Sequence, residues 1–296
     1  MDGKYSSNPL FIIGNPRSGT TLIRLMLTCH SKISIPPECG FVLWLYDKYF
    51  DWKAIDNDNS ERVLIFLDDL FKCNKFENWG LNKKNIHQEI IDVRPNNYAS
   101  LCELVYNIYG ITYNYNFSVW GDKNNYYLNC IDKLYSLFIN SKFLHIVRDG
   151  RDLACSYQNL TKVNSESPYF PKLNYEILEI AHEWANNLSS IRNSFAKLPK
   201  ESHMTIRYED LVNNPEQTLT PVCKWLGVEY DSNMLNFYIM NRKHKLEPES
   251  TLDWKKKTLK PLSSDSIGIY LKLLSIEDQN SFSDVAHSEL IINSYL

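Results

Sequence analysis

Residues 10–21 read Leu-Phe-Ile-Ile-Gly-Asn-Pro-Arg-Ser-Gly-Thr-Thr, and this stretch decides the fold. Its first four residues form an apolar run that ends at Gly14, which is typical of a buried strand. Residues 20–29 then carry leucine, isoleucine and methionine at helical spacing. The stretch therefore predicts a strand, a tight loop and a helix, an arrangement in which backbone N–H groups and the helix dipole can bind a phosphate.

The loop has the spacing of a Walker A motif, GxxxxG followed by two residues. Thr20 stands where nucleoside triphosphatases carry the lysine that reaches a γ-phosphate, so the loop disfavours ATP hydrolysis and kinase chemistry. Arg17 instead predicts a guanidinium on the end of a smaller anionic chain. The alternative is a loop whose glycines serve only a tight turn, and the flanking strand, the helix and the paired threonines argue against it.

Two later runs, 143–147 and 203–206, repeat the pattern of a buried strand, and 117–120 is a further candidate. Helical patterns at 177–194 and 215–226 separate them. Strands that alternate with helices indicate an α/β fold, here a P-loop-type three-layer sandwich around a central, mainly parallel sheet. We expect one domain over residues 1–296, with a helical insertion at about 41–119 that includes helices at 61–71 and 98–109.

Composition limits the function. The 296 residues carry a formal net charge of −3, so the general basic field of a nucleic-acid-binding protein is absent. Residues 1–9 are polar and do not resemble a secretion signal, and no run approaches the roughly 18 apolar residues of a membrane span. The seven cysteines are scattered without a CxxC pair, which argues against a zinc site or a disulfide framework. We expect a cytoplasmic protein with no nucleic-acid partner, no metal and no membrane span.

Residues 143–157 read FLHIVRDGRDLACSY. Together with PRSGTT at 16–21, this motif resembles the sulfotransferase superfamily, and its bacterial and tyrosylprotein sulfotransferase-like branch in particular. The resemblance covers most of the chain but not 41–119. It implies an enzyme that uses 3′-phosphoadenosine 5′-phosphosulfate (PAPS) as co-substrate, leaves 3′-phosphoadenosine 5′-phosphate (PAP) as product and needs no metal.

The resemblance also assigns cofactor-binding residues. The first motif, with Arg17, Ser18, Gly19, Thr20 and Thr21, would bind the 5′-phosphosulfate. Arg148 and Ser156 of the second motif would bind the 3′-phosphate, and an arginine fork and a serine after a strand suit one anion. A surface ion-pair cluster at 148–152 is the alternative. Tyr208, in the segment IRYEDL at 206–211, corresponds to a family tyrosine near the adenine or its phosphate.

Sulfuryl transfer needs a base and positive charge. Glu38 follows the first helix, and by resemblance it is the general base; burial beside Phe41 and Trp44 would give it a raised pKa. A glutamate at a helix start is the alternative. His30 is a rival base, because cytosolic family members use histidine, whereas His145 within a strand is expected to be structural.

Lys123 lies in the segment WGDKN at 120–124, which looks like a family turn whose lysine faces the active site. With Arg17 it would stabilise charge on the leaving group, and Asp122 would orient Lys123 or serve as an alternative base. A plain polar turn explains the same residues.

Two positions depart from the family pattern. Ile269 stands at an expected basic position, and Leu160 stands where the tyrosylprotein-type branch often has an arginine. Weaker binding of the 3′-phosphate is the expected consequence, unless nearby lysines compensate: Lys255, Lys256, Lys257 and Lys260, with Lys162 near Leu160.

The leading hypothesis is thus a PAPS-dependent sulfotransferase with Glu38, Arg17 and Lys123 in catalysis. A P-loop nucleotide kinase or triphosphatase is one alternative, and a non-catalytic nucleotide-binding module of the same fold is another. The acceptor is a hydroxyl on a small molecule, polyketide, glycan or peptide, and the 41–119 insertion is expected to select it.

Overall fold

Within residues 9–113 and 116–296, which the computed structural model describes, five strands form one parallel sheet in the order β2-β3-β1-β4-β5. Residues 1–8 of the polar N-terminal stretch and 114–115 of the predicted insertion lie outside the described residues. The strands have these bounds: β1 Leu10–Ile13, β2 Ile33–Ser34, β3 Val119–Lys123, β4 Lys142–Val147 and β5 His203–Arg207. The predicted α/β fold with a parallel sheet is confirmed.

The strand predictions at 10–13, 143–147 and 203–206 are confirmed within one residue. The candidate at 117–120 is displaced, because β3 begins at Val119 and continues through Gly121 and Asp122 to Lys123. Polar residues that close a strand carry no apolar signal, and a side-chain pattern alone therefore ends the strand too early. The two-residue β2 is too short to leave a pattern.

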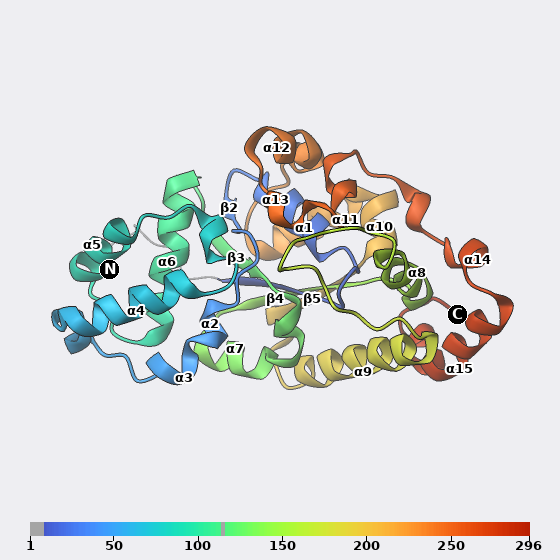
Figure 1. Cartoon of the computed structure of the whole chain (residues 1–296), viewed down its shortest axis with the longest axis horizontal. Coiled ribbons are helices and arrows are strands. Elements are labelled where there is room, and N and C mark those ends of the chain that lie inside the picture. Colours follow the sequence, from blue (N-terminus) through green and yellow to red (C-terminus); the bar gives the residue numbers. More distant parts are fainter. Residues whose placement is uncertain (1–8, 114–115) are drawn as a thin grey trace.

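Helices cover both faces of the sheet, because side chains alternate along β1. Leu10 and Ile12 pack into a core with α1 and α11, whereas Phe11 and Ile13 pack into a second core with the insertion and α9. Figure 1 accordingly shows α9 below the sheet and α1 and α11 above it. The helices outside the insertion have these bounds: α1 Thr20–Thr28, α7 Ile131–Leu137, α8 Gly150–Leu160, α9 Ile177–Phe195, α10 Tyr208–Asn213, α11 Pro215–Leu226, α12 Phe237–His244, α13 Glu249–Leu252, α14 Tyr270–Leu273 and α15 Ile276–Ile292.

The insertion gathers at one end of the molecule, at the left in Figure 1. It contains α2 Phe41–Trp44, α3 Tyr46–Tyr49, α4 Ser60–Lys72, α5 Lys83–Val93 and α6 Tyr98–Tyr113. The helices predicted at 61–71 and 98–109 are α4 and α6. The Tyr106 ring of α6 stacks on Trp120 of β3, with centroids 4.3 Å apart, which fixes the insertion against the β2–β3 edge. A single domain over 1–296 stays a prediction.

Short 3₁₀ helices and one long loop complete the chain. The 3₁₀ helices are η1 Ala54–Asp58, η2 Phe76–Trp79, η3 Asn125–Asn129, η4 Lys200–Ser202, η5 Ser232–Asn236, η6 Lys256–Leu259 and η7 Ser264–Ser266. Residues 161–176, here called the roof segment, contain no helix or strand and cross in front of the sheet between α8 and α9 (Figure 1). Within the described part of the chain, none of the helices combines the length and apolar character that a membrane-spanning helix needs.

Candidate functional site

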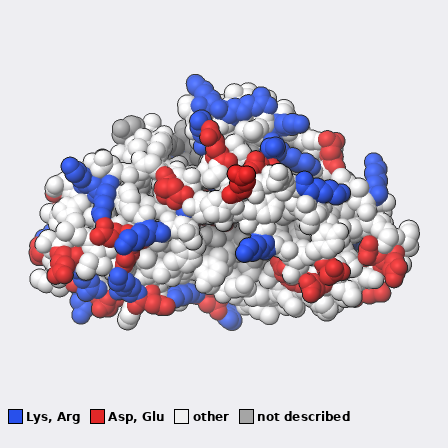
Figure 2. All heavy atoms as spheres, in the orientation of Figure 1, with Lys and Arg blue, Asp and Glu red and all other residues white. Residues whose placement is uncertain are grey.

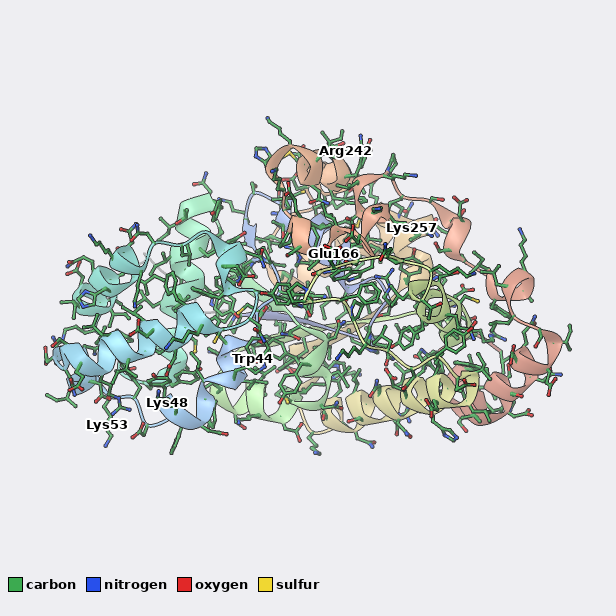
Figure 3. All side chains as sticks on the ribbon, in the orientation of Figure 1. Trp44, Lys48, Lys53, Glu166, Arg242 and Lys257 are labelled. Carbon is green, nitrogen blue, oxygen red and sulfur yellow. The ribbon has the colours of Figure 1, made fainter. Side chains whose placement is uncertain are left out.

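A pocket of about 550 Å³ lies at the carboxyl ends of β1, β3 and β4. Its volume is within the usual range for small-molecule sites, and the carboxyl edge of a parallel sheet is where such folds bind ligands. The roof segment forms one wall, and Figure 3 places Glu166 of this segment in front of the middle of the sheet. Figure 2 shows Lys and Arg side chains gathered over α12, which packs against η6 beside the pocket.

The loop between β1 and α1 has a backbone conformation that requires glycine at position 19. Gly19 precedes α1 with φ of 102°, and a β-carbon there would lie 2.7 Å from Cδ2 of Tyr208. Only glycine meets both conditions without displacing the tyrosine. Arg17 also has a left-handed backbone, with φ of 68°, and its side chain lines the pocket.

The predicted phosphate-binding residues divide into two groups. Arg17, Gly19, Thr20 and Thr21 line the pocket. Ser18 is buried, and its hydroxyl donates to the Asn15 carbonyl at 2.7 Å, so its side chain closes the loop. Ser18 does not line the pocket, and its hydroxyl would have to leave the Asn15 carbonyl before it could donate to a phosphate. Its role as a phosphate ligand stays a prediction.

Arg148 and Ser156 both contact Arg17, although each lies more than 130 residues from Arg17 in the sequence. The Arg17 Nε donates to Ser156 Oγ at 3.2 Å, and Arg148 donates to the Arg17 carbonyl at 3.1 Å. The Arg148 guanidinium lies 4.7 Å from the ring centre of Tyr208, a cation–π contact. Arg148 also donates to the Ser266 carbonyl at 2.7 Å, which joins the segment after η6 to this end of the pocket.

The guanidinium groups of Arg17 and Arg148 make this end of the pocket suitable for binding an anion. Burial, and next the nearby Arg148, lower the pKa of Arg17 to about 10. The Nε of Arg148 is buried without a hydrogen-bond partner among the described residues. Buried hydrogen-bond donors in proteins nearly always have a partner. An anionic ligand bound beside Arg17 and Arg148 would supply the partner that Arg148 Nε lacks.

Glu38 lies at the β3 end of the pocket, beside Lys123 and within a cluster of lysines. Its Oε2 is 3.4 Å from the Lys123 ammonium, 3.5 Å from that of Lys75 and 3.9 Å from that of Lys255. Burial alone would raise the pKa of Glu38, but the three lysines outweigh burial, and the pKa is lowered to about 2. The prediction of a raised pKa for Glu38 is therefore wrong. The sequence around Glu38 did not reveal the lysines, because they come from segments that are distant in sequence.

Lys123 extends from the end of β3 into the pocket. Burial lowers its pKa to about 8, although the carboxylate of Glu38 acts in the opposite direction. Asp122 is fully buried instead, where it accepts hydrogen bonds from Tyr106 at 2.6 Å and Tyr127 at 2.5 Å. Burial raises its pKa to about 6. Asp122 does not line the pocket, which argues against its role as a base. Its Oδ1 accepts from the Lys123 backbone amide at 2.7 Å, so it holds the backbone from which Lys123 extends.

Neither histidine considered above lines the pocket. His30 is buried after α1, with Nε2 2.7 Å from the Glu229 carbonyl and Nδ1 accepting from the Lys32 amide at 2.9 Å. His145 is buried in β4, and burial lowers its pKa to about 4. Among the described side chains, no three of His, Cys, Asp and Glu lie together as a metal site would require.

Ile269 and Leu160, the two departures from the family pattern, both line the pocket. The four lysines Lys255, Lys256, Lys257 and Lys260 line it as well, as their sequence positions suggested. Lys257 donates to Ser266 Oγ at 2.5 Å, next to the backbone oxygen that Arg148 contacts. Basic side chains therefore reach the Arg148 end of the pocket from a different segment.

Sequence reasoning missed Lys75 and the roof segment. From the insertion, only Lys75 is among the residues that line the pocket in the described structure, whereas the roof segment contributes four side chains: Val163, Tyr169, Pro171 and Leu173. Trp254 joins them, and its ring meets Phe170 edge-on at 5.4 Å. None of these positions belongs to a motif with a known spacing, so the sequence contained no local signal for them.

The sequence matches a known protein family over most of its length. Residues 9–232 match the model described as "Sulfotransferase family". The chain is 25% identical over 238 residues to protein-tyrosine sulfotransferase 2 of Gallus gallus, covering 80% of this chain and 56% of that protein. It is 24% identical over 236 residues to protein-tyrosine sulfotransferase of Drosophila melanogaster, covering 78% and 41%. The chain thus spans about half the length of these relatives.

A solved structure shares the fold. The sulfotransferase domain of the Synechococcus PCC 7002 olefin synthase superposes with a TM-score of 0.52 and 21% identity, over 93% of this chain and 97% of that one. This similarity concerns the fold alone. The family match covers most of the sequence and includes the loop, Glu38, Lys123 and the Arg148 motif. The chain therefore belongs to the sulfotransferase family.

Proposed function

We propose that this protein transfers a sulfuryl group from PAPS to a hydroxyl of an acceptor that has an apolar body. The observation that carries the proposal is the pocket with two different ends. At one end, buried Arg148 donates to the backbone carbonyl of partly buried Arg17, and its charge helps to lower the pKa of the Arg17 guanidinium. The other end holds Glu38 and Lys123, 3.4 Å apart. An anion-binding end next to a base and a cation is what a group transfer from an anionic donor requires.

The nucleotide would occupy the Arg148 end. Arg148 and Ser156 would hold the 3′-phosphate, and Tyr208 would lie near the adenine or its phosphate. Arg17, Thr20 and Thr21 would hold the 5′-phosphosulfate with the N-terminus of α1. PAPS, when bound, supplies the activated sulfuryl group.

At the other end, Glu38 would accept the proton of the acceptor hydroxyl while its oxygen attacks sulfur. Lys123 and Arg17 would neutralise the phosphate oxygen from which sulfur departs. The low pKa of Glu38 keeps it ionised at neutral pH, so it is ready to accept a proton. Its weak basicity in this state suits a transfer in which the hydroxyl proton leaves late, after charge develops on the attacking oxygen.

The acceptor wall is proposed to consist of the roof segment and Trp254. Val163, Tyr169, Pro171 and Leu173 present apolar surface to the pocket, and Tyr169 lies beside Lys75, which contacts Glu38. The insertion, which we expected to select the acceptor, would contribute the side chain of Lys75 and the short helix η2 that follows it. This surface favours an acceptor whose hydroxyl is attached to an aromatic or aliphatic body over a free sugar.

Calorimetric titration with PAP and with ATP plus magnesium tests the cofactor. Tight binding of PAP by the wild type, lost in Arg148→Ala and kept in Arg94→Ala, would support the proposal. Arg94 is an exposed arginine of the insertion that pairs with Asp58 and does not line the pocket, so its removal controls for the loss of one positive charge. Preference for ATP would favour a P-loop kinase, and binding of neither nucleotide would favour a non-catalytic module.

Transfer of ³⁵S from PAPS tests the acceptor wall. The probes are 2-naphthol, a short tyrosine peptide and glucose. We expect transfer to the first two and little to glucose, and Glu38→Gln should abolish transfer while leaving PAP affinity unchanged. Transfer by Glu38→Gln at the wild-type rate would remove Glu38 from the mechanism.

A further inference from the structure

The turn between α4 and η2 carries a lysine that no motif predicted. Lys75 has φ of 71°, in the left-handed region, and it precedes η2. A non-glycine residue rarely adopts this backbone, and such residues are held there by their surroundings. Here Phe76 and Trp79 of η2 are buried in the core, and the Asn78 amide donates to the Lys75 carbonyl at 3.1 Å. The side chain of Lys75 therefore starts from a fixed point.

The same short helix holds the backbone next to Glu38. The Trp79 Nε1 donates to the Pro37 carbonyl at 2.9 Å, in a buried hydrogen bond between the insertion and the residue that precedes Glu38. The Lys75 ammonium reaches Glu38 Oε2 at 3.5 Å. Residues 75–79 thus contact both the backbone before Glu38 and its carboxylate.

The roof segment closes on these residues from the other side. The Tyr169 hydroxyl donates to Glu77 Oε1 at 2.7 Å, and the Lys75 ammonium lies 5.6 Å from the centre of the Tyr169 ring. A cation at this distance from an aromatic ring is attracted to it. Lys75 therefore lies between the acceptor wall and the carboxylate.

The ammonium groups reach one carboxylate oxygen. Lys75, Lys123 and Lys255 all contact Oε2 of Glu38. Lys123 comes from β3, and Lys255 is shared with Glu247, whose carboxylate is fixed by Arg24 of α1 at 2.6 Å. Each lysine thus arrives from a different element, and together they orient the carboxylate.

We propose that Lys75 is a positioning residue that holds Glu38 through Oε2, so that Oε1 faces the acceptor hydroxyl, and that η2 and Tyr169 keep Lys75 in place. This inference rests on the proposed function, because it gives Glu38 its role as proton acceptor. It adds a residue from the insertion to the machinery at the Glu38 end. The charged groups that face Glu38 are Lys75, Lys123, Lys255 and, at longer range, Glu247.

The test reads the state of Glu38 directly and needs no acceptor. The full-length protein is labelled with ¹³Cδ-glutamate and titrated by NMR from pH 8 to 3.5 with PAP present, and the Glu38 resonance is assigned by its loss in Glu38→Gln. In the wild type the resonance should stay at the ionised position throughout. In Lys75→Met its midpoint should rise by about two units into this range, because one of three contacting cations is lost.

Two variants control the test. Lys75→Arg restores the charge and should keep Glu38 ionised, and Lys72→Met removes an exposed lysine from the end of α4 and should change nothing. Methionine keeps the β-carbon and the length of the lysine, so the backbone strain at residue 75 is unchanged. A Glu38 that stays ionised in Lys75→Met, or that titrates equally in Lys72→Met, would overturn the proposal.

Calorimetry with PAP separates this inference from the proposed function. Lys75→Met should bind PAP as the wild type does, because the Lys75 ammonium contacts Glu38 and the Tyr169 ring and not the residues proposed to hold the nucleotide. If no variant and not even the wild type binds PAP, the proposed function fails whatever the NMR titration shows. If PAP binds equally and the Glu38 resonance is indifferent to Lys75, only the positioning role fails.

Discussion

Replacing Glu247 by glutamine should destabilise the protein strongly, because it would leave a buried cation without its counter-ion. Glu247 accepts from Arg24 NH2 at 2.6 Å, with side chains only 4% and 2% exposed. It also pairs with Lys255 and accepts from Thr251 at 2.6 Å. Removing one member of a buried ion pair costs about 3–5 kcal/mol. For a chain of 296 residues that corresponds to a fall in Tm of about 5–8 °C.

The pH dependence of this effect has a definite sign. Burial alone would raise the pKa of Glu247, but Lys255 and Arg24 outweigh burial and hold it well below its usual range. A carboxyl with a depressed folded-state pKa contributes stability above its unfolded pKa of about 4.3 and loses it as the pH falls. The loss of folding stability in Glu247→Gln relative to the wild type should therefore be complete at pH 7 and should become smaller below about pH 4.

Chemical and thermal unfolding at pH 7 measure the effect. Asp58→Asn, which breaks an exposed pair with Arg94, is the matched control and should leave Tm nearly unchanged. The double variant Arg24→Met/Glu247→Met should lose less stability than Glu247→Gln, since it removes both charges together. A loss below about 1 kcal/mol in Glu247→Gln would refute the reasoning, because an unpaired buried guanidinium cannot cost so little.

Three further variants test the pocket and the core. Gly19→Ala should weaken PAP binding about tenfold or more, because its β-carbon would meet Tyr208 at 2.7 Å and its φ of 102° disfavours any side chain; unchanged calorimetric affinity would contradict this. Asp122 binds a proton more tightly when folded, since burial raises its pKa to about 6, so its contribution to stability falls as the pH rises from about 4 to 6. The Tm of the wild type relative to Asp122→Asn should accordingly increase from pH 7 to pH 5, and a constant difference would argue against it. Ile269→Arg should tighten PAP binding about fivefold by adding a charge-assisted contact within the pocket, and calorimetry showing no gain would mean that residue 269 does not reach the ligand.

The parts of the fold that the sequence predicts are those with a local cause. The apolar run at 10–13, Gly19 and the helix that follows are neighbours in sequence, so their pattern specifies the phosphate loop without any distant contact. Arg148 and Ser156 share one strand-to-helix motif, and the family resemblance of that motif predicts both as ligands of the 3′-phosphate. β2 consists of two residues and is formed only by pairing with β3.

The environment of Glu38 could not be predicted in this way. Its neighbours in sequence are apolar, which suggested a raised pKa, whereas its neighbours in space are lysines at positions 75, 123 and 255. The charge of a site built from distant segments depends on long-range packing, which a local pattern does not contain. The same limit applies to the roof segment, whose composition resembles that of an ordinary loop.

The hydrogen bond between Trp79 and Pro37 has a consequence for engineering. The insertion looks like an accessory lobe that could be exchanged between family members to change substrate preference. A chimera joined at 41 and 119 would, however, remove the tryptophan that fastens the chain just before Glu38. Grafts should therefore transplant residues 33–40 and 75–79 as one unit, because the insertion and the segment before Glu38 are joined by a buried hydrogen bond.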